Sequence, residues 1–222
     1  MLNAFTLPYG APMKSIKPLQ NKRQEHREFL NKLYGLARSS YDLTRKYFLF
    51  GRETLIKELL QEPWESLIEV GPGTGWNLRK LHKGRPSSLY GGLEASDKML
   101  EFAKERCPFA VFRQGFAEDT PYQDLLGEAP DRILFSYCLT MVQDPHLALE
   151  KAVEQLAPGG QVVVVDFADF QGAPFVLRGG LRRWLKAFHV TPLDTSLFEP
   201  FTQDITFGPW HYFVIARIHK PA

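Results

Sequence analysis

Three glycines flanked by two acidic residues form the most informative pattern in this 222-residue chain. Glu69 lies two positions before the glycine-rich turn GPGTG, residues 71–75, and Glu94 ends the next apolar run. A turn of this kind between a strand and a helix directs backbone N–H groups and a helix N-terminus at a ligand. The pattern predicts a site where the backbone comes close to a ligand and two carboxylates lie beside it.

Two other kinds of nucleotide site also use glycine turns, and the spacing here disfavours both. A dinucleotide site has the pattern G-x-G-x-x-G, whereas here Gly75 arrives one residue early and Trp76 stands in the last position. An indole there would obstruct the close packing of strand and helix over a pyrophosphate. A P-loop is excluded because no Gly-Lys-Ser or Gly-Lys-Thr follows the turn.

An acid before a G-x-G-x-G turn, with a second acid ending the next strand, resembles the S-adenosylmethionine site of class I methyltransferases. EVGPGTG, residues 69–75, is similar to the first motif of that family, and YGGLEAS, residues 90–96, to its second. The resemblance implies that Glu94 accepts the ribose hydroxyls and that Glu69 meets the ammonium group. The cofactor-binding residues implied in this way are Glu69, Gly71, Gly73, Gly75, Asn77, Glu94, Ala95, Met99, Phe116, Ala117, Ser136 and Tyr137.

The adenine end of this site departs from the family pattern. QGFAED, residues 114–119, resembles the stretch that contacts adenine, with the Ala117 N–H directed at the ring. Many relatives carry Asp where this chain has Phe116. Either Phe116 packs on adenine, or Glu118 or Asp119 supplies the missing hydrogen-bond acceptor.

From about residue 53 onward, apolar runs typical of strands alternate with amphipathic stretches typical of helices. Such alternation predicts an α/β fold with a Rossmann-like, seven-stranded, mostly parallel sheet. The last two runs, on either side of the turn GPW, predict an antiparallel C-terminal hairpin. The expected strands are residues 66–70, 87–94, 109–115, 131–138, 161–167, 202–207 and 211–219, and the expected helices are 52–61, 76–83, 97–106 and 145–156.

The N-terminal quarter differs from the rest in charge. Residues 1–52 contain ten Lys and Arg against three acids, 10 − 3 = +7, which indicates either an anionic partner or a solvated basic arm. Residues 1–20 predict an irregular arm, and from about Asn21 an amphipathic helix follows that is interrupted at Gly35. We divide the chain into two parts. Residues 1–52 are expected to form a substrate lid or a membrane contact, and residues 53–222 a methyltransferase domain.

Two windows outside the cofactor motifs resemble a narrower family. SSYDLTRKYFLFGRETLI, residues 39–56, and LKAFHVTPLD, residues 185–194, are similar to segments of the bacterial N-methyltransferases that make betaine lipids from diacylglyceryl homoserine. The resemblance implies methylation of a lipid amino headgroup. Phosphatidylethanolamine or another small molecule is an alternative acceptor, and a non-catalytic cofactor- or lipid-binding module is an alternative of another class. Quinone C-methylation is disfavoured, because neither window suggests it.

Methyl transfer from a sulfonium is an in-line displacement, so the enzyme aligns a neutral amine and excludes water. The methylated product is a cation, which aromatic faces stabilise. The aromatic residues that are candidates for such a cage, or alternatively for core positions, are Tyr41, Tyr47 and Tyr137. His189 is the candidate general base, although a loop histidine also serves structural roles. Arg45 and Arg52 are candidates for binding a carboxylate.

FVLRGGLRRWLKAF, residues 175–188, predicts a basic amphipathic helix. Its apolar residues at helical spacing are Leu181, Trp184, Leu185 and Phe188, and its interleaved cations are Arg178, Arg182, Arg183 and Lys186. A helix of this composition fits either docking on an anionic membrane surface or packing on the sheet as a lid.

Composition limits the cellular setting. The only cysteines, Cys107 and Cys138, indicate no disulfide framework and a reducing compartment. The sequence has no apolar run long enough to span a membrane, and its start does not resemble a secretory signal. We expect a cytoplasmic protein, peripheral at the inner membrane face if the basic segments bind lipid. We expect no metal site, and no nucleic-acid partner because no Asn-Pro-Pro-Tyr-type motif follows the fourth strand.

Overall fold

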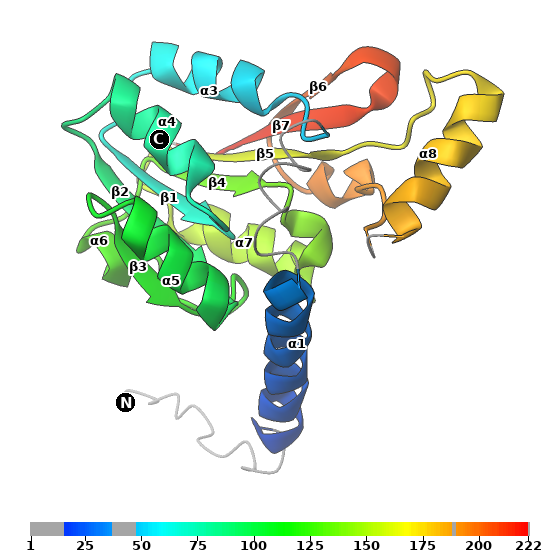
Figure 1. Cartoon of the computed structure of the whole chain (residues 1–222). Helices are drawn as coiled ribbons and strands as arrows, with labels where there is room; N and C mark the ends of the chain where they lie inside the picture. Colours follow the sequence, from blue (N-terminus) through cyan, green and yellow to red (C-terminus); the bar gives the residue numbers. More distant parts are fainter. Residues whose placement is uncertain (1–15, 37–47, 188–189, 222) are drawn as a thin grey trace, which may run out of the picture.

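The structure, a computed structural model, describes residues 16–36, 48–187 and 190–221 (Figure 1). Within these residues seven strands form one sheet with the order β3-β2-β1-β4-β5-β7-β6. The first five strands are parallel, and β7 pairs antiparallel with both β5 and β6. The predicted mostly parallel sheet with a C-terminal hairpin is confirmed. The strands are β1 Ser66–Val70, β2 Leu89–Glu94, β3 Val111–Gln114, β4 Arg132–Ser136, β5 Gln161–Phe167, β6 Gln203–Phe207 and β7 Phe213–His219.

Helices cover both faces of the sheet (Figure 1), because successive side chains of a strand point to opposite sides. In β5, Val163 packs in one apolar cluster with α3 and α4, whereas Val162 packs in another with α6 and α7. Burial on both sides explains why the strands read as continuous apolar runs. The helices are α1 Ile16–Leu36, α3 Arg52–Gln61, α4 Trp76–Gly84, α5 Asp97–Arg106, α6 Gln123–Leu126, α7 Pro145–Gln155 and α8 Phe175–Ala187, with 3₁₀ turns η1 Leu139–Met141, η2 Thr195–Phe198 and η3 Pro209–His211.

The N-terminal helix α1 starts earlier than predicted. It begins at Ile16 rather than near Asn21, so the prediction of an irregular arm is wrong for the last residues of 1–20. Pro18 is compatible with the helix because it lies in the first turn, where backbone N–H groups have no intrahelical partner. Gly35 does not interrupt the helix, which continues to Leu36.

Helix α1 lies at the carboxyl edge of the parallel strands. The Asn31 side chain accepts a hydrogen bond from the Ser96 hydroxyl over 2.7 Å and donates one to Asp97 over 3.2 Å, just after β2. After β4, the Gln143 side chain donates to the Lys22 carbonyl over 3.3 Å. Helix α1 is therefore held against the loops where ligands of open α/β sheets bind. The division of the chain at residue 52 stays a prediction, although α3 begins at that residue.

Helix α8 turns its apolar face toward the protein. Leu185 is buried, and Leu181 and Trp184 pack against the cluster that covers β5 and α3. Because this face is occupied by internal packing, it is not available to a membrane. Phe188, the fourth residue of the predicted apolar face, lies outside the described residues.

Candidate functional site

The glycine-rich turn follows β1 and needs glycine at three positions. Gly71, Gly73 and Gly75 have φ angles of 63°, 56° and 71°, in the left-handed region that favours glycine. A Cβ atom on Gly71 would lie 2.9 Å from Cβ of Cys138. A Cβ atom on Gly75 would overlap the sulfur of Cys107, so this glycine serves packing and is not among the residues that line the pocket. Gly71 and Gly73 do line the pocket, as predicted.

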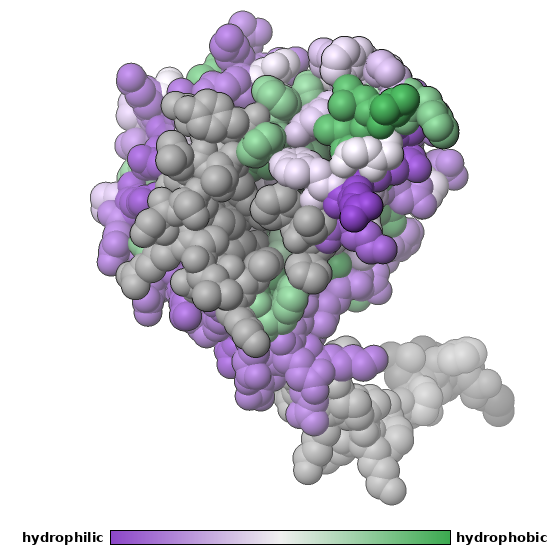
Figure 2. Space-filling view, turned by 45° about the vertical axis from the view of Figure 1, so that its right-hand side comes forward, coloured by the Kyte–Doolittle hydropathy of each residue, from purple (hydrophilic) through white to green (hydrophobic). Residues whose placement is uncertain are grey.

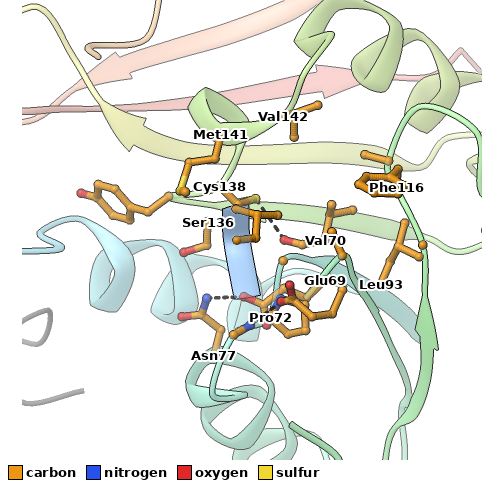
Figure 3. Close-up of a pocket in the computed structure, with 18 of the residues that line it drawn as sticks. Glu69, Val70, Pro72, Asn77, Leu93, Phe116, Ser136, Cys138, Met141 and Val142 are labelled. Atoms are coloured by element: carbon orange, nitrogen blue, oxygen red, sulfur yellow. Dashed lines mark hydrogen bonds between the residues drawn. The ribbon is translucent and has the colours of Figure 1, made fainter. Parts of the chain in front are cut away.

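Glu69 and Asn77 form a buried polar pair at one end of this pocket (Figure 3). The Asn77 amide donates to Oε1 of Glu69 over 2.5 Å. Burial raises the pKa of Glu69 from its ordinary 4.5 to about 8. Among the described residues, Oε2 of Glu69, Oδ1 of Asn77 and Oγ of Ser136 have no hydrogen-bond partner. Because all three oxygens can accept hydrogen bonds, this end of the pocket fits a cationic ammonium group.

Glu94 ends β2 on the opposite side of the glycine turn. Its carboxylate accepts a hydrogen bond from the Gly73 N–H over 3.2 Å and one from the Ser96 N–H over 3.0 Å. Burial raises the pKa of Glu94, and these backbone hydrogen bonds oppose the shift. A carboxylate held in this way has lone pairs left for two hydroxyl donors of a ligand. Ala95 also lines the pocket.

Met99, in contrast, is not among the lining residues. Its side chain is buried beneath the glycine turn, with Cε 3.4 Å from where a Cβ on Gly73 would lie. Its backbone N–H donates to the Ser96 hydroxyl, which caps the N-terminus of α5. The structure therefore places Met99 in support of the turn rather than on the pocket surface.

Phe116 lies at the other end of the pocket from Asn77 (Figure 3). Ala117 and Glu118 line the pocket beside it, and Glu118 also accepts a hydrogen bond from the Asp144 N–H. Asp119 is not among the lining residues and forms an ion pair with Arg23 of α1. Of the three alternatives for replacing the Asp of many relatives, Asp119 lies outside the pocket lining, whereas Phe116 and Glu118 both belong to it.

Two residues of α1 complete this end of the pocket. Leu30 is buried there, and the His26 ring centroid lies 6.3 Å from that of Phe116. Burial lowers the pKa of His26, so the imidazole is neutral at pH 7. Leu30 belongs to the apolar stripe visible in the sequence. His26 carries no such signal, and only the docking of α1 identifies it.

Ser136, Tyr137 and Cys138 line the pocket where β4 ends. Tyr137 has a φ of 54°, a left-handed conformation that is strained for a residue with a side chain and is common at functional sites. Its hydroxyl donates a hydrogen bond to the Phe50 carbonyl. The phenol of Tyr137 is thus used to hold the chain just before α3. Tyr41, Tyr47, Arg45 and His189, the other predicted residues at the acceptor end, lie outside the described residues.

Arg52 and Trp76 face each other at the end of the pocket that contains Glu69. Both line the pocket, and the Arg52 guanidinium carbon lies 4.3 Å from the centroid of a Trp76 ring. This distance is typical of a cation–π contact. The indole that argued against a dinucleotide site thus positions a cation beside Glu69, where a ligand carboxylate can pair with it.

A cluster of aromatic rings, which we call the aromatic wall, packs around the chain segment before α3. The Phe48 ring lies 4.8 Å from that of Trp184, and the Phe50 ring lies 5.1 Å from that of Tyr212. The Tyr212 hydroxyl donates to the Phe48 carbonyl over 3.1 Å. The members of the aromatic wall are Phe48, Phe50, Tyr137, Phe167, Trp184 and Tyr212. Sequence reasoning missed Phe167 and Tyr212, because neither stands in a motif.

The described residues contain no group of three or more His, Cys, Asp or Glu side chains arranged to hold a metal ion. None of the described helices is long and apolar enough to cross a membrane. The lining of the pocket contains carboxylates, backbone N–H groups, the Arg52 guanidinium and aromatic rings.

Known proteins with similar sequences are methyltransferases. A family model described as "Methyltransferase domain" matches residues 41–220. The demethylmenaquinone methyltransferase of Tropheryma whipplei (strain Twist) is 28% identical over 193 residues, which cover 82% of this chain and 77% of the relative. A ubiquinone/menaquinone biosynthesis C-methyltransferase of Geotalea daltonii is 24% identical over 193 residues, with 82% and 79% covered.

Solved structures share the fold at low sequence identity. The plantazolicin methyltransferase BpumL, in complex with a triazolic desmethylPZN analog and SAH, has a TM-score of 0.67 at 16% identity, over 95% of this chain and 100% of that one. A protein of Thermotoga maritima, described as a SAM-dependent methyltransferase and possible histamine N-methyltransferase, has a TM-score of 0.62 at 21% identity, over 86% and 99%. Both likenesses confirm the Rossmann-like fold.

Proposed function

This chain belongs to the methyltransferase-domain family, and on that premise we propose that it methylates the amino headgroup of a lipid, with diacylglyceryl homoserine as the leading acceptor. The methyl donor is S-adenosylmethionine. When bound, the donor supplies an electrophilic methyl group on a sulfonium. The protein's own residues bind and orient the two reactants.

The two ends of the donor pocket bind different parts of the donor. At one end Glu69, with Asn77 and Ser136, accepts the donor's ammonium group, and Arg52 pairs with its carboxylate. The three partnerless oxygens and the guanidinium beside them support this assignment. Between the ends, Gly71 and Gly73 let the backbone approach the ligand.

Toward the other end, Glu94 accepts the ribose hydroxyls. Phe116 packs on adenine, and the Ala117 N–H donates to the ring. The position of both residues in the lining of the pocket, with His26 and Leu30 of α1 beside them, supports this assignment.

At the acceptor end, Tyr137, the member of the aromatic wall that lines the pocket, contacts the amine, and the rings that pack behind it exclude water. The acceptor nitrogen has to be neutral to attack, and each methylation leaves a cation that aromatic faces stabilise. Excluding water also strengthens electrostatic interactions inside the site. A homoserine headgroup carries a carboxylate in addition to its amine, and Arg45 is the candidate partner for it.

One observation carries this proposal. The two windows that resemble betaine-lipid enzymes lie far apart in the sequence, yet the described parts of both belong to one corner of the fold. Phe48, in the first window, contacts Trp184, which directly precedes the second window. In that second window, the Leu193 N–H donates to the carbonyl of Phe167, another member of the aromatic wall, over 2.7 Å.

Quinone C-methylation is the second candidate, because the curated relatives carry that activity in their names. A quinone acceptor needs no partner for a headgroup carboxylate and forms no ammonium product. Phosphatidylethanolamine is the closest lipid alternative, since its headgroup has the amine without the carboxylate. The three acceptors therefore differ in whether the site must bind a headgroup carboxylate and whether it must stabilise a cationic product.

The deciding experiment offers purified protein and methyl-labelled S-adenosylmethionine three acceptors in separate vesicle preparations: diacylglyceryl homoserine, phosphatidylethanolamine and a demethylmenaquinone. We expect label in the homoserine lipid, and none with Glu94→Ala protein. Label in the quinone or in phosphatidylethanolamine would replace the proposal with that acceptor. Calorimetric binding of the donor without labelling of any acceptor would instead favour a non-catalytic module.

A further inference from the structure

The N-terminal end of α8 exposes large apolar side chains. Phe175 is 87% exposed, Val176 88% and Leu177 41%, in contrast to the packed residues one and two turns further along the helix. Trp210, 57% exposed, lies in η3, and its Cα is 2.9 Å from where a Cβ on Gly172, three residues before α8, would lie. We call these four residues, Phe175, Val176, Leu177 and Trp210, the α8 tip patch.

The rest of α8 is positively charged. The helix contains four cations and no acidic residue. Arg178 donates hydrogen bonds to the carbonyls of Gln171 and Ala173, and Arg182 donates to the carbonyl of Asp169. Within the described part of the chain, no carboxylate forms an ion pair with Arg183 or Lys186, and both are exposed. In the view of Figure 2, where α8 comes forward, strongly hydrophobic atoms gather directly beside strongly hydrophilic ones.

We propose that the α8 tip patch inserts into the surface of an anionic lipid bilayer while the cations of α8 bind its headgroups. Exposed Phe and Trp side chains next to uncompensated cations are the composition of an interfacial membrane contact. The occupant is a lipid surface rather than a protein, because the patch combines unpaired positive charge with protruding apolar side chains and the helix offers no acidic residue for a mixed-charge interface.

The location of the patch links docking to the active site. The inner face of α8 packs on the aromatic wall through Trp184, whose ring lies 4.8 Å from that of Phe48. The next residue, Leu49, lines the donor pocket. Helix α8 is therefore connected to the lining of the pocket through Trp184 and the segment before α3. This docking role rests on the proposed lipid acceptor. Vesicle binding, however, can be measured without any methyl transfer.

The test is sedimentation of full-length protein with vesicles of phosphatidylcholine alone or with added phosphatidylglycerol. Phe175→Ser with Val176→Ser removes the inserted side chains, and Arg183→Glu with Lys186→Glu reverses two cations. We expect each pair to reduce partition onto anionic vesicles about tenfold, and added salt to mimic the charge reversal. All four side chains are exposed, so the melting temperature should not change.

Matched control pairs change similar residues elsewhere. Leu89→Ser with Val111→Ser alters two exposed apolar side chains at the opposite end of the sheet, and Lys83→Glu with Lys104→Glu reverses two exposed cations. Vesicle binding that survives both α8 pairs, or that falls equally with the controls, overturns the docking surface. So does a wild-type dimer that the Phe175 and Val176 changes dissociate without altering vesicle binding. Specific loss of vesicle binding in a protein that methylates no lipid amine would retain the docking surface and reject the proposed acceptor.

Discussion

Asn77 holds one oxygen of the buried Glu69 carboxylate through a 2.5 Å hydrogen bond, and the other oxygen has no partner among the described residues. The pair is therefore oriented but incompletely satisfied. Because burial raises the pKa of Glu69 to about 8, the ligand-free protein holds this group mainly protonated at neutral pH. Binding of a cation opposite the open oxygen would favour the ionised form.

Replacing Glu69 by Gln should change how stability depends on pH. The pKa of Glu69 is about 8 in the folded protein and 4.5 ordinarily, so its contribution to stability is fully present below pH 4.5 and is lost as the pH rises through about 8. In ligand-free protein, Glu69→Gln should remove a decline on the order of a few kcal/mol across that range. Urea denaturation at several pH values measures it. The exposed Glu65→Gln is the control, and parallel curves for Glu69→Gln and wild type would contradict the assignment.

Donor binding should release a proton from Glu69 below pH 8. The ammonium of S-adenosylmethionine stabilises the carboxylate, so affinity should rise with pH until about 8, where the group is already largely ionised. Titration calorimetry at pH 7 in buffers of different ionisation enthalpy counts the protons released. We expect nearly one for wild type and none from this group in Glu69→Gln. An equal count in both proteins would show that Glu69 does not titrate on binding.

Glu94→Ala should weaken S-adenosylmethionine binding by more than tenfold. Two charge-assisted hydrogen bonds to the ribose, at roughly 1.5–3 kcal/mol each, would be lost. The same change frees the N–H groups of Gly73 and Ser96, so a melting curve must accompany the titration. Glu94→Gln, which retains one acceptor oxygen, should bind with intermediate affinity. Unchanged affinity in a folded Glu94→Ala protein would remove Glu94 from the donor site.

Tyr137→Phe and Tyr212→Phe should impair acceptor use through position rather than proton transfer. Their hydroxyls hold the carbonyls of Phe50 and Phe48, so each change should lower the free energy of unfolding by about 1–2 kcal/mol and raise KM for the acceptor. The pH dependence of kcat should not move. Tyr90→Phe is the control, because its hydroxyl bonds a carbonyl far from the pocket. A shifted pH profile in Tyr137→Phe would instead indicate a chemical role.

Asn31→Ala should loosen α1 and raise the Kd for S-adenosylmethionine by up to about tenfold, because two hydrogen bonds to the start of α5 are lost. Gln24→Ala, which removes an exposed hydrogen bond within the same helix, should leave the Kd unchanged. Calorimetry on wild type, Asn31→Ala and Gln24→Ala distinguishes an effect of α1 docking on the Kd from an effect of the stability of the helix itself. Equal Kd values for Asn31→Ala and wild type would show that these two hydrogen bonds do not contribute to donor binding.

Most residues predicted for the donor half of the site lie at one pocket because they are close together in the sequence or on adjacent strands. Glu69, the glycine turn and Asn77 lie within nine residues, and Glu94 ends the adjacent strand, so backbone geometry alone brings them together. His26 and Tyr212 could not be predicted, because their positions depend on how α1 and the loop before β7 pack. Nor could the sequence predict that Trp184 points toward the protein, since an amphipathic pattern does not indicate what packs against its apolar face.

The Arg52–Trp76 contact gives the protein a built-in optical reporter. Arg52 lies over the Trp76 indole in the pocket, and if its guanidinium pairs with the donor carboxylate as proposed, we expect the electric field at that ring to change. Indole emission responds to such a field, so donor loading can be followed by fluorescence without a label. The chain has four tryptophans, and Trp76→Phe identifies the share of the signal that comes from this ring. We therefore expect the fluorescence of Trp76, the residue that breaks the dinucleotide pattern, to report occupancy of the pocket in solution.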